Sequence, residues 1–117
     1  MSAITTHVLD TARGCPAEGL AVRLESVPER PDSADLSRQT LGTAATNSDG
    51  RVPELGPDHV EAGTYRLVFD TAAYFAATGQ TGFFPQVSLT FTVTDPEQHY
   101  HVPVLLSPFG YSTYRGS

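Results

Sequence analysis

The chain has 117 residues and a formal net charge of −6, with seven Lys+Arg against thirteen Asp+Glu. The basic residues are scattered rather than clustered, which argues against nucleic acid and anionic membranes as partners. Since no stretch approaches the length of a membrane span and the N-terminal segment does not resemble a signal peptide, we expect one cytoplasmic domain over residues 1–117, long enough to bury its own core.

Alternation of apolar and polar residues predicts a series of short β-strands. In chain order they are expected near residues 4–9, 20–27, 41–46, 64–70, 86–94, 100–106 and 111–114. The clearest example is "QVSLTFTVT", in which Val87, Leu89 and Phe91 fall on one face and the Ser and Thr residues between them on the other. Stretches such as "ARGCPAEG", "NSDG" and "TDPEQ" contain turn-forming residues that separate the strands. The pattern predicts an all-β sandwich of seven to eight strands.

One short helix is expected among these strands. The segment "TAAYFAAT" is rich in alanine, which favours a helix over residues 71–78. Either Asp70 or Thr71 can cap its first turn, and Gly79 can take the left-handed conformation that ends it. The stretch "VPERPDSADLSRQ" at 27–39 contains two prolines and several charges, which predicts an exposed connection within the domain.

The segment "HYHVPVLLS" distributes its polar groups unusually between its two faces. If its even-numbered positions fill the core, then His101, Pro103 and Leu105 point outwards. On the first strand, His7 shares a face with Leu9 in the same way. Apolar residues on an outer sheet face indicate a contact between subunits, so both histidines are expected beside such a contact.

Other kinds of site are disfavoured by the residues present. His99 and His101 could bind a metal as a pair, but a zinc site needs at least a third ligand, and no Cys or carboxylate has the spacing for it. No G-x-S-x-G motif surrounds any serine, which argues against a serine hydrolase. Cys15 lies among turn-forming residues and is expected to be an unreactive loop thiol, and His59 is expected to be a loop residue.

Four segments together span most of the chain: "THVLDTARGCPAEGLAV", "TNSDGR", "TYRLVFDTAAYFAATG" with the nearby "FFP", and "HYHVPVLLSPFGYSTYRGS". In combination they resemble the 5-hydroxyisourate hydrolases, the transthyretin-related enzymes of urate degradation. Most of them are also similar to transthyretin, the hormone carrier of the same fold. The features that distinguish the enzymes are His7 in "THVLD", Arg51 in "DGR", His101 in "HYH", and the terminal "YRGS" formed by Tyr114, Arg115, Gly116 and Ser117.

The resemblance implies a transthyretin-like sandwich that hydrolyses 5-hydroxyisourate to 2-oxo-4-hydroxy-4-carboxy-5-ureidoimidazoline without a metal or another cofactor. Ring opening requires a base for water, donors for the developing oxyanion and an acid for the leaving nitrogen. We expect His7 and His101 to transfer protons, in an order that the residues leave open, and Arg51 to polarise the substrate carbonyl. The tail at 114–117 is expected to position substrate and water. His99 lies outside the family match and is expected to be a flanking, partly exposed residue.

The resemblance also implies a homotetramer, a dimer of dimers in which outer sheet faces enclose a channel and the active sites lie at subunit contacts. The outward positions of Leu9, Pro103 and Leu105 agree with such an assembly. The main alternative is a non-catalytic small-molecule carrier in which the histidines, the arginine and the tail only line a pocket. A second alternative is an immunoglobulin-like interaction module, for which a secretion signal would be expected.

Overall fold

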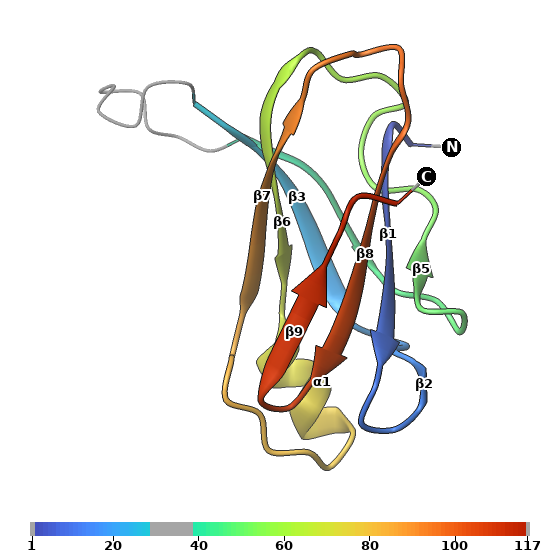
Figure 1. Ribbon diagram of the computed structural model, residues 1–117, viewed down its shortest axis with the longest axis vertical. Coiled ribbons are helices and arrows are strands. Elements are labelled where there is room, and N and C mark those ends of the chain that lie inside the picture. Colours follow the sequence, from blue (N-terminus) through green and yellow to red (C-terminus); the bar gives the residue numbers. More distant parts are fainter. Residues whose placement is uncertain (1, 29–38, 117) are drawn as a thin grey trace.

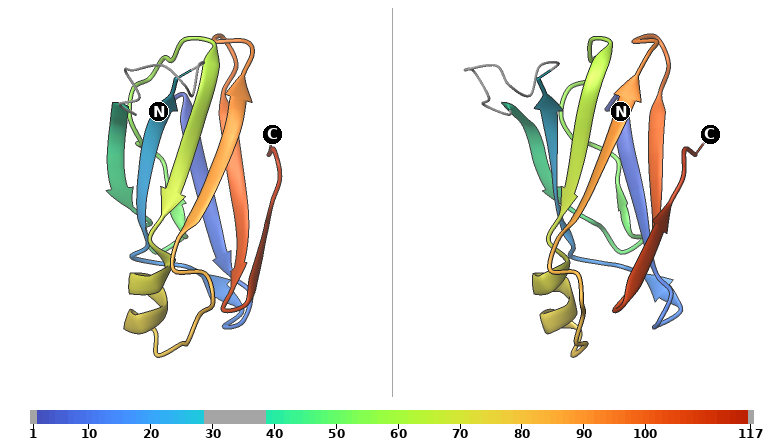
Figure 2. Two further views of the ribbon diagram at one scale, coloured as in Figure 1. Left: turned by 90° about the vertical axis from the view of Figure 1, so that its left-hand side faces the viewer. Right: turned by 60° about the vertical axis from the view of Figure 1, so that its left-hand side comes forward.

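The computed structural model describes residues 2–28 and 39–116. The elements in these residues are β1 (Ile4–Asp10), β2 (Cys15–Pro16), β3 (Ala21–Val27), β4 (Gln39–Ala45), β5 (Arg51–Val52), β6 (Gly63–Phe69), α1 (Thr71–Ala77), β7 (Val87–Val93), β8 (Tyr100–Ser107) and β9 (Gly110–Thr113). One sheet has the strand order β4-β3-β6-β7, and the other has the order β2-β1-β8-β9 with β5 also paired to β1 (Figure 1). Figure 2 shows the two sheets facing each other as layers. The predicted all-β sandwich with one short helix is confirmed.

The seven predicted strands are all present, and their ends lie within two residues of the expected positions. Two further strands are present: β2 falls in a stretch that the sequence predicts as a turn, and β5 directly follows another. Each is only two residues long, which is too short for an alternating pattern to be recognised. They are strands because they pair with the edge of β1. Most of the predicted connection at 27–39 lies outside the described residues.

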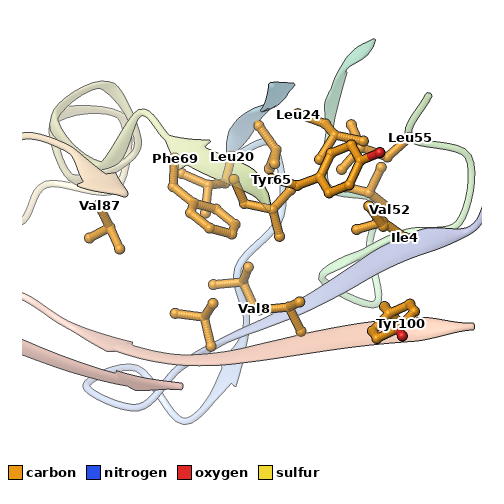
Figure 3. Packing of buried hydrophobic residues seen from close by; sticks show 14 of the residues in the cluster. Ile4, Val8, Leu20, Leu24, Val52, Leu55, Tyr65, Phe69, Val87 and Tyr100 are labelled. Atoms are coloured by element: carbon orange, nitrogen blue, oxygen red, sulfur yellow. The ribbon is translucent and has the colours of Figure 1, made fainter. Parts of the chain in front are cut away.

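The core lies between the two sheets and consists of the residues that alternation assigns to the inner faces. Val22 and Leu24 are at most 2 % exposed. Figure 3 shows Val8 and Tyr100 of one sheet on the opposite side of the core from Phe69 of the other. Burial of a Val, Leu or Phe side chain contributes about 1.5–3 kcal/mol, so this layer holds the sheets together. Polar side chains are thereby directed to the outer faces.

Strand β8 shows this division most clearly. The residues that it turns into the core are the even-numbered Tyr100, Val102, Val104 and Leu106. His101 and Leu105 face outwards, as predicted, and Leu105 is 37 % exposed. Pro103 lies on this outward side as well, where it lines the cleft with His101, but it is buried. The C-terminal tail covers it, because a Cβ atom on Gly116 would lie only 3.1 Å from Pro103 Cγ.

Helix α1 lies at one end of the sandwich, opposite the end where the first and last described residues are found (Figure 1). Of the two predicted caps, Asp70 is the N-cap, and its side chain accepts a hydrogen bond from the Ala73 N–H at 3.1 Å. Gly79 has a φ of 70°, as expected for the residue that follows the helix. Nowhere in residues 2–28 and 39–116 is there a helix with both the length and the apolar character needed to cross a membrane.

A buried carboxylate joins this end of the sandwich to β1. Asp10 is 1 % exposed and accepts hydrogen bonds from the Tyr74 hydroxyl at 2.7 Å and the Gln80 side-chain amide at 3.0 Å. The backbone N–H of Arg13 donates a third, also at 3.0 Å. Burial by itself would raise the pKa of Asp10, but these hydrogen bonds favour the ionised form and lower its pKa overall. Burial and the bond to Asp10 raise the pKa of Tyr74 to about 12, so the phenol remains a donor.

We predict that Asp10→Asn lowers the free energy of unfolding by about 1–3 kcal/mol at pH 7, because an amide cannot replace all three hydrogen bonds. Since the pKa of Asp10 is lowered by folding, its contribution is full above the pKa of the unfolded chain and is lost as the pH falls through the folded value. Urea unfolding at pH 7 and at more acidic pH measures both effects. Asp49→Asn, in an exposed turn, is the control, and equal losses in the two variants would contradict the prediction.

Candidate active site

Three strands bring the predicted polar residues to the outer face of one sheet. Arg51 of β5 pairs with His7 of β1, and His101 of β8 pairs with Thr5 of β1. Paired strands lie about 4.8 Å apart, and residues two positions apart on a strand share a face. His7, Arg51 and His101, which are far apart in the sequence, therefore form one cluster.

The turn before β5 fixes the position of Arg51. The Asn47 side-chain oxygen accepts a hydrogen bond from the Arg51 N–H at 3.0 Å. Gly50 has a φ of 76°, and its carbonyl accepts a hydrogen bond from the Val8 N–H at 2.8 Å. A Cβ atom on Gly50 would collide with the Val8 carbonyl, so a glycine is required at this close approach. The turn predicted from "NSDG" thus docks onto β1 and sets Arg51 beside His7.

The C-terminal tail continues the pairing of β9 along β8. The Gly116 N–H donates to the His101 carbonyl oxygen at 2.8 Å, and the two residues form an isolated bridge. The Thr113 hydroxyl donates to the Pro103 carbonyl oxygen at 2.8 Å. Tyr114, which is 60 % exposed, borders the same cleft as His101. The tail therefore forms one wall of the candidate site.

The side chain of Arg115 lies away from the histidine cluster. Its guanidinium carbon is 4.6 Å from the centre of the Tyr100 ring, and it donates a hydrogen bond to the Gln98 side-chain oxygen at 2.8 Å. Because neighbouring residues of an extended chain point to opposite sides, Arg115 faces the core side of the tail. These contacts hold the tail against β8. Ser117 lies outside the described residues.

Two adjoining clefts open over the cluster. One has a volume of about 340 Å³, and His7, Arg51 and His101 are among its lining residues. The other, of about 310 Å³, is lined in part by Thr5, His99, Arg51 and His101. Arg51 and His101 border both, so a ligand in either cleft meets a guanidinium and an imidazole. A further hollow of about 350 Å³ lies over the other sheet and is lined by none of the predicted site residues.

The surroundings of His101 disfavour a positive charge on it. Its side chain is half-buried, and burial is the main cause that lowers its pKa. The Arg51 guanidinium, His7 and His99 lower the pKa of His101 further. Its Nδ1 atom is 2.8 Å from the Thr5 hydroxyl. The imidazole is therefore neutral at pH 7, and Nε2 is the ring nitrogen left for a ligand.

Thr5 is a candidate that the sequence prediction did not include. It is 7 % exposed, and its hydroxyl oxygen also lies 3.0 Å from His99 Nε2. Alternation does place Thr5 on the outward face with His7, but nothing in the sequence indicates that β1 pairs with β8. His99 itself is exposed and flanks the cluster, as predicted.

The remaining predicted residues are accounted for as follows. His59 is an exposed loop residue, as expected, whereas Cys15 is half-buried in β2 rather than in a loop. Within the part of the chain that the structure describes, no group of three His, Cys, Asp or Glu side chains is placed to hold a metal ion. The pair of His99 and His101 directs one nitrogen of each ring towards the Thr5 hydroxyl.

The fold and the cluster define a β-sandwich protein with a polar ligand cleft on the outer face of one sheet. The chain belongs to the HIUase/Transthyretin family, whose model matches residues 4–116. It is 49 % identical over 117 residues to the 5-hydroxyisourate hydrolase of Mus musculus, with 99 % of this chain and 96 % of the relative covered.

Solved structures of two functional kinds are similar to this chain. The 5-hydroxyisourate hydrolase of Klebsiella pneumoniae has a TM-score of 0.81 at 37 % identity, with 97 % of this chain and 98 % of that chain covered. Transthyretin from Sparus aurata has a TM-score of 0.84 at 30 % identity, with 99 % and 97 % covered. Because the fold is common to both, the function has to be argued from the side chains of the site.

We predict that Gly116→Ala displaces the tail from β8. A Cβ atom at this position would lie 2.8 Å from His101 Cδ2 and 3.1 Å from Pro103 Cγ, so either the imidazole or the tail must move. The free energy of unfolding should change by less than about 1 kcal/mol, because the tail lies at the sheet edge. The amide of residue 116 should exchange with solvent on the order of tenfold faster, as measured by NMR. Gly110→Ala is the control, since its Cβ atom would meet only Ser107 Oγ at 3.8 Å; similar exchange in both variants would refute the prediction.

Proposed function

We propose that this protein hydrolyses 5-hydroxyisourate, the activity that names its relatives from mouse and Klebsiella. In the proposed reaction, water attacks an amide-like carbon of the six-membered ring and the ring C–N bond breaks. The water oxygen ends in the new carboxylate and a proton moves to the leaving nitrogen, which gives 2-oxo-4-hydroxy-4-carboxy-5-ureidoimidazoline. All the groups that we assign to these steps belong to the chain itself, so the proposal includes no metal and no other cofactor.

The observation that carries the proposal is the convergence of two imidazoles and one guanidinium over adjoining clefts. His7, Arg51 and His101 come from three strands and meet on one face. Hydrolysis of a cyclic amide needs a base, an acid and a donor for the oxyanion, and these three side chains supply all of them. A site that only binds a ligand does not need two groups that exchange protons near neutral pH.

We assign the first proton transfer to His101. Since its pKa is lowered, the ring is neutral at pH 7 and can take a proton from water at Nε2. The planar, permanently charged Arg51 suits the carbonyl oxygen on which negative charge develops. His7, which lines the same cleft, is assigned to substrate contact and a further proton transfer. The tail formed by Tyr114, Arg115, Gly116 and Ser117 is proposed to position substrate and water. The contacts of Arg115 with Gln98 and Tyr100 anchor this tail.

A carrier function is the second candidate, and the similarity to Sparus aurata transthyretin favours it. The same clefts could hold a small molecule without changing it. The two candidates differ in what they require of His101: a carrier needs only its shape and polarity, whereas a hydrolase needs its proton exchange. The activity measurement below separates them.

We further propose that the protein acts as a cytoplasmic homotetramer, a dimer of dimers with its sites at subunit contacts. Leu105, at 37 % exposure, and the half-buried Leu9 line the cleft together with His7 and His101. Apolar side chains beside a polar site suit a contact with a second copy of the sheet face.

For the activity, we predict that the purified protein speeds the decay of hydroxyisourate formed by a urate oxidase, followed by ultraviolet absorbance. His101→Asn should lower kcat/KM by about 10²–10⁴-fold because it removes the proton acceptor. The wild-type rate should fall on acidification only below the usual histidine range near pH 6.5, because the pKa of His101 is lowered.

His59→Asn, in an exposed loop, is the matched control and should keep the wild-type rate. A decay that the wild-type protein leaves unchanged or prolongs would support the carrier instead.

For the assembly, we predict that Leu105→Glu dissociates the tetramer, because a buried unpaired carboxylate opposes the contact. Sedimentation analysis measures the mass of the assembly, which should decrease in this variant. The kcat/KM of the variant should decrease as well. Thr43→Glu places the same charge on the exposed face of the other sheet and should leave the mass unchanged. A fully active wild-type monomer would contradict the assembly.

A further inference from the structure

A single threonine hydroxyl lies between two imidazoles at the edge of the candidate site. Thr5 Oγ1 is 2.8 Å from His101 Nδ1 and 3.0 Å from His99 Nε2. Both distances are within the range of hydrogen bonds. Thr5 is buried at 7 % exposure, and its strand pairs directly with that of His101, so the hydroxyl is held in place between the rings.

The number of protons in this arrangement restricts how the two rings can be protonated. The Thr5 hydroxyl has one hydrogen to donate, so it donates to one ring and accepts from the other. If it donates to His99, then His101 carries its proton on Nδ1 and has a free lone pair on Nε2, which is the form that acts as a base. If His99 is protonated on both nitrogens, it must donate to Thr5; Thr5 then donates to His101 Nδ1, and Nε2 carries the proton. The charge on His99 thus determines whether His101 is a base or an acid.

The two rings differ in how well they tolerate a positive charge. His101 is half-buried, which disfavours a positive charge on its ring. The nearby Arg51 guanidinium and His7 imidazole disfavour that charge further. His99 is exposed to solvent and is one of the residues that line a surface hollow, together with Asp58, His59 and Glu97. A positive charge is therefore disfavoured at His101, whereas the His99 ring lies in contact with solvent.

We propose that Thr5 is a positioning residue that couples His101 to His99, and that His99 holds the positive charge while His101 changes from base to acid. This inference rests on the proposed hydrolysis. It gives a role to Thr5 and His99, which lie outside the predicted cluster of His7, Arg51 and His101. It also explains how the His101 imidazole can serve both proton transfers.

The protons balance over one turnover. His101, with its proton on Nδ1, takes a proton from the attacking water at Nε2 as the new C–O bond forms. The Nδ1 proton passes to Thr5 Oγ1 while the Thr5 hydroxyl proton passes to His99 Nε2, which leaves His101 neutral and His99 charged. As the ring C–N bond breaks, His101 gives its Nε2 proton to the leaving nitrogen. The two relay protons return through Thr5 in the same step, so that Nδ1 of His101 is protonated as Nε2 loses its proton; no imidazolate forms, and the starting state is restored.

The kinetic test compares Thr5→Val with Thr5→Ser. Loss of the hydroxyl should lower kcat by about 10- to 100-fold, a part of the full acid–base contribution, whereas serine should restore most of the rate. In mixtures of H₂O and D₂O, kcat should vary non-linearly with deuterium content for the wild type, because several protons move together, and linearly for Thr5→Val.

His99→Asn, at an exposed position, tests the same relay if Thr5→Val misfolds. Adding it to Thr5→Val should cause little further loss, because the two residues act as one unit.

Thr6→Val is the matched control. Thr6 is the next residue on the strand, points into the core and donates its hydroxyl to the Val102 carbonyl oxygen at 2.6 Å, so its loss removes a hydroxyl of the same kind without touching a histidine. Wild-type kinetics in Thr5→Val, or a loss no larger than that of Thr6→Val, would overturn the relay.

A second readout does not depend on activity. With ¹⁵N-labelled histidine, NMR should show His101 changing from the Nδ1–H to the Nε2–H form as His99 becomes protonated in the wild type and in Thr5→Ser, but not in Thr5→Val. If the wild type does not hydrolyse hydroxyisourate, the proposed function fails while this coupling is still measured. If hydrolysis is confirmed and the His101 tautomer is independent of His99, the relay alone is refuted.

Discussion

The parallel pairing of β1 with β8 is the constraint on which the rest of the structure depends. These two strands are separated by most of the chain, yet they are paired at seven consecutive positions from Ile4 with Tyr100 to Asp10 with Leu106. A shift by one residue would turn His101 into the core and Val102 outwards, because side chains alternate between faces. The shift is unfavourable because it would expose the buried Val102, Val104 and Leu106 of β8. The burial that stabilises the sandwich therefore also fixes the position of the histidine cluster.

The faces of the strands could be predicted from the sequence, but the contacts between strands could not. Alternation correctly assigned His7 and His101 outwards, since it reports burial along one strand. It contains no information about partners, so the pairing of Thr5 with His101 and the covering of Pro103 by the tail emerged only in the structure. The same holds for Arg115: the family match gave no indication of the contacts that its side chain makes with Gln98 and Tyr100.

The sandwich itself does not separate catalysis from transport, because hydrolases and transthyretins share it. Its regular strands provide a rigid surface on which side chains two residues apart are held at fixed spacing. Arg51 illustrates this: its position follows from a glycine turn pressed against β1 rather than from a mobile loop. A change of function on such a surface requires new side chains and no new backbone.

The C-terminal tail contacts two different parts of the structure, one on each of its sides. While Gly116 contacts the His101 ring, the neighbouring Arg115 covers Tyr100 and borders an inner hollow of about 350 Å³ together with Leu89 and Phe91 of the opposite sheet. The tail thus lines this hollow on one side and the cleft of the candidate site on the other. A substitution that changes the packing of Phe91 would therefore also affect the tail, whose other side lines the candidate site.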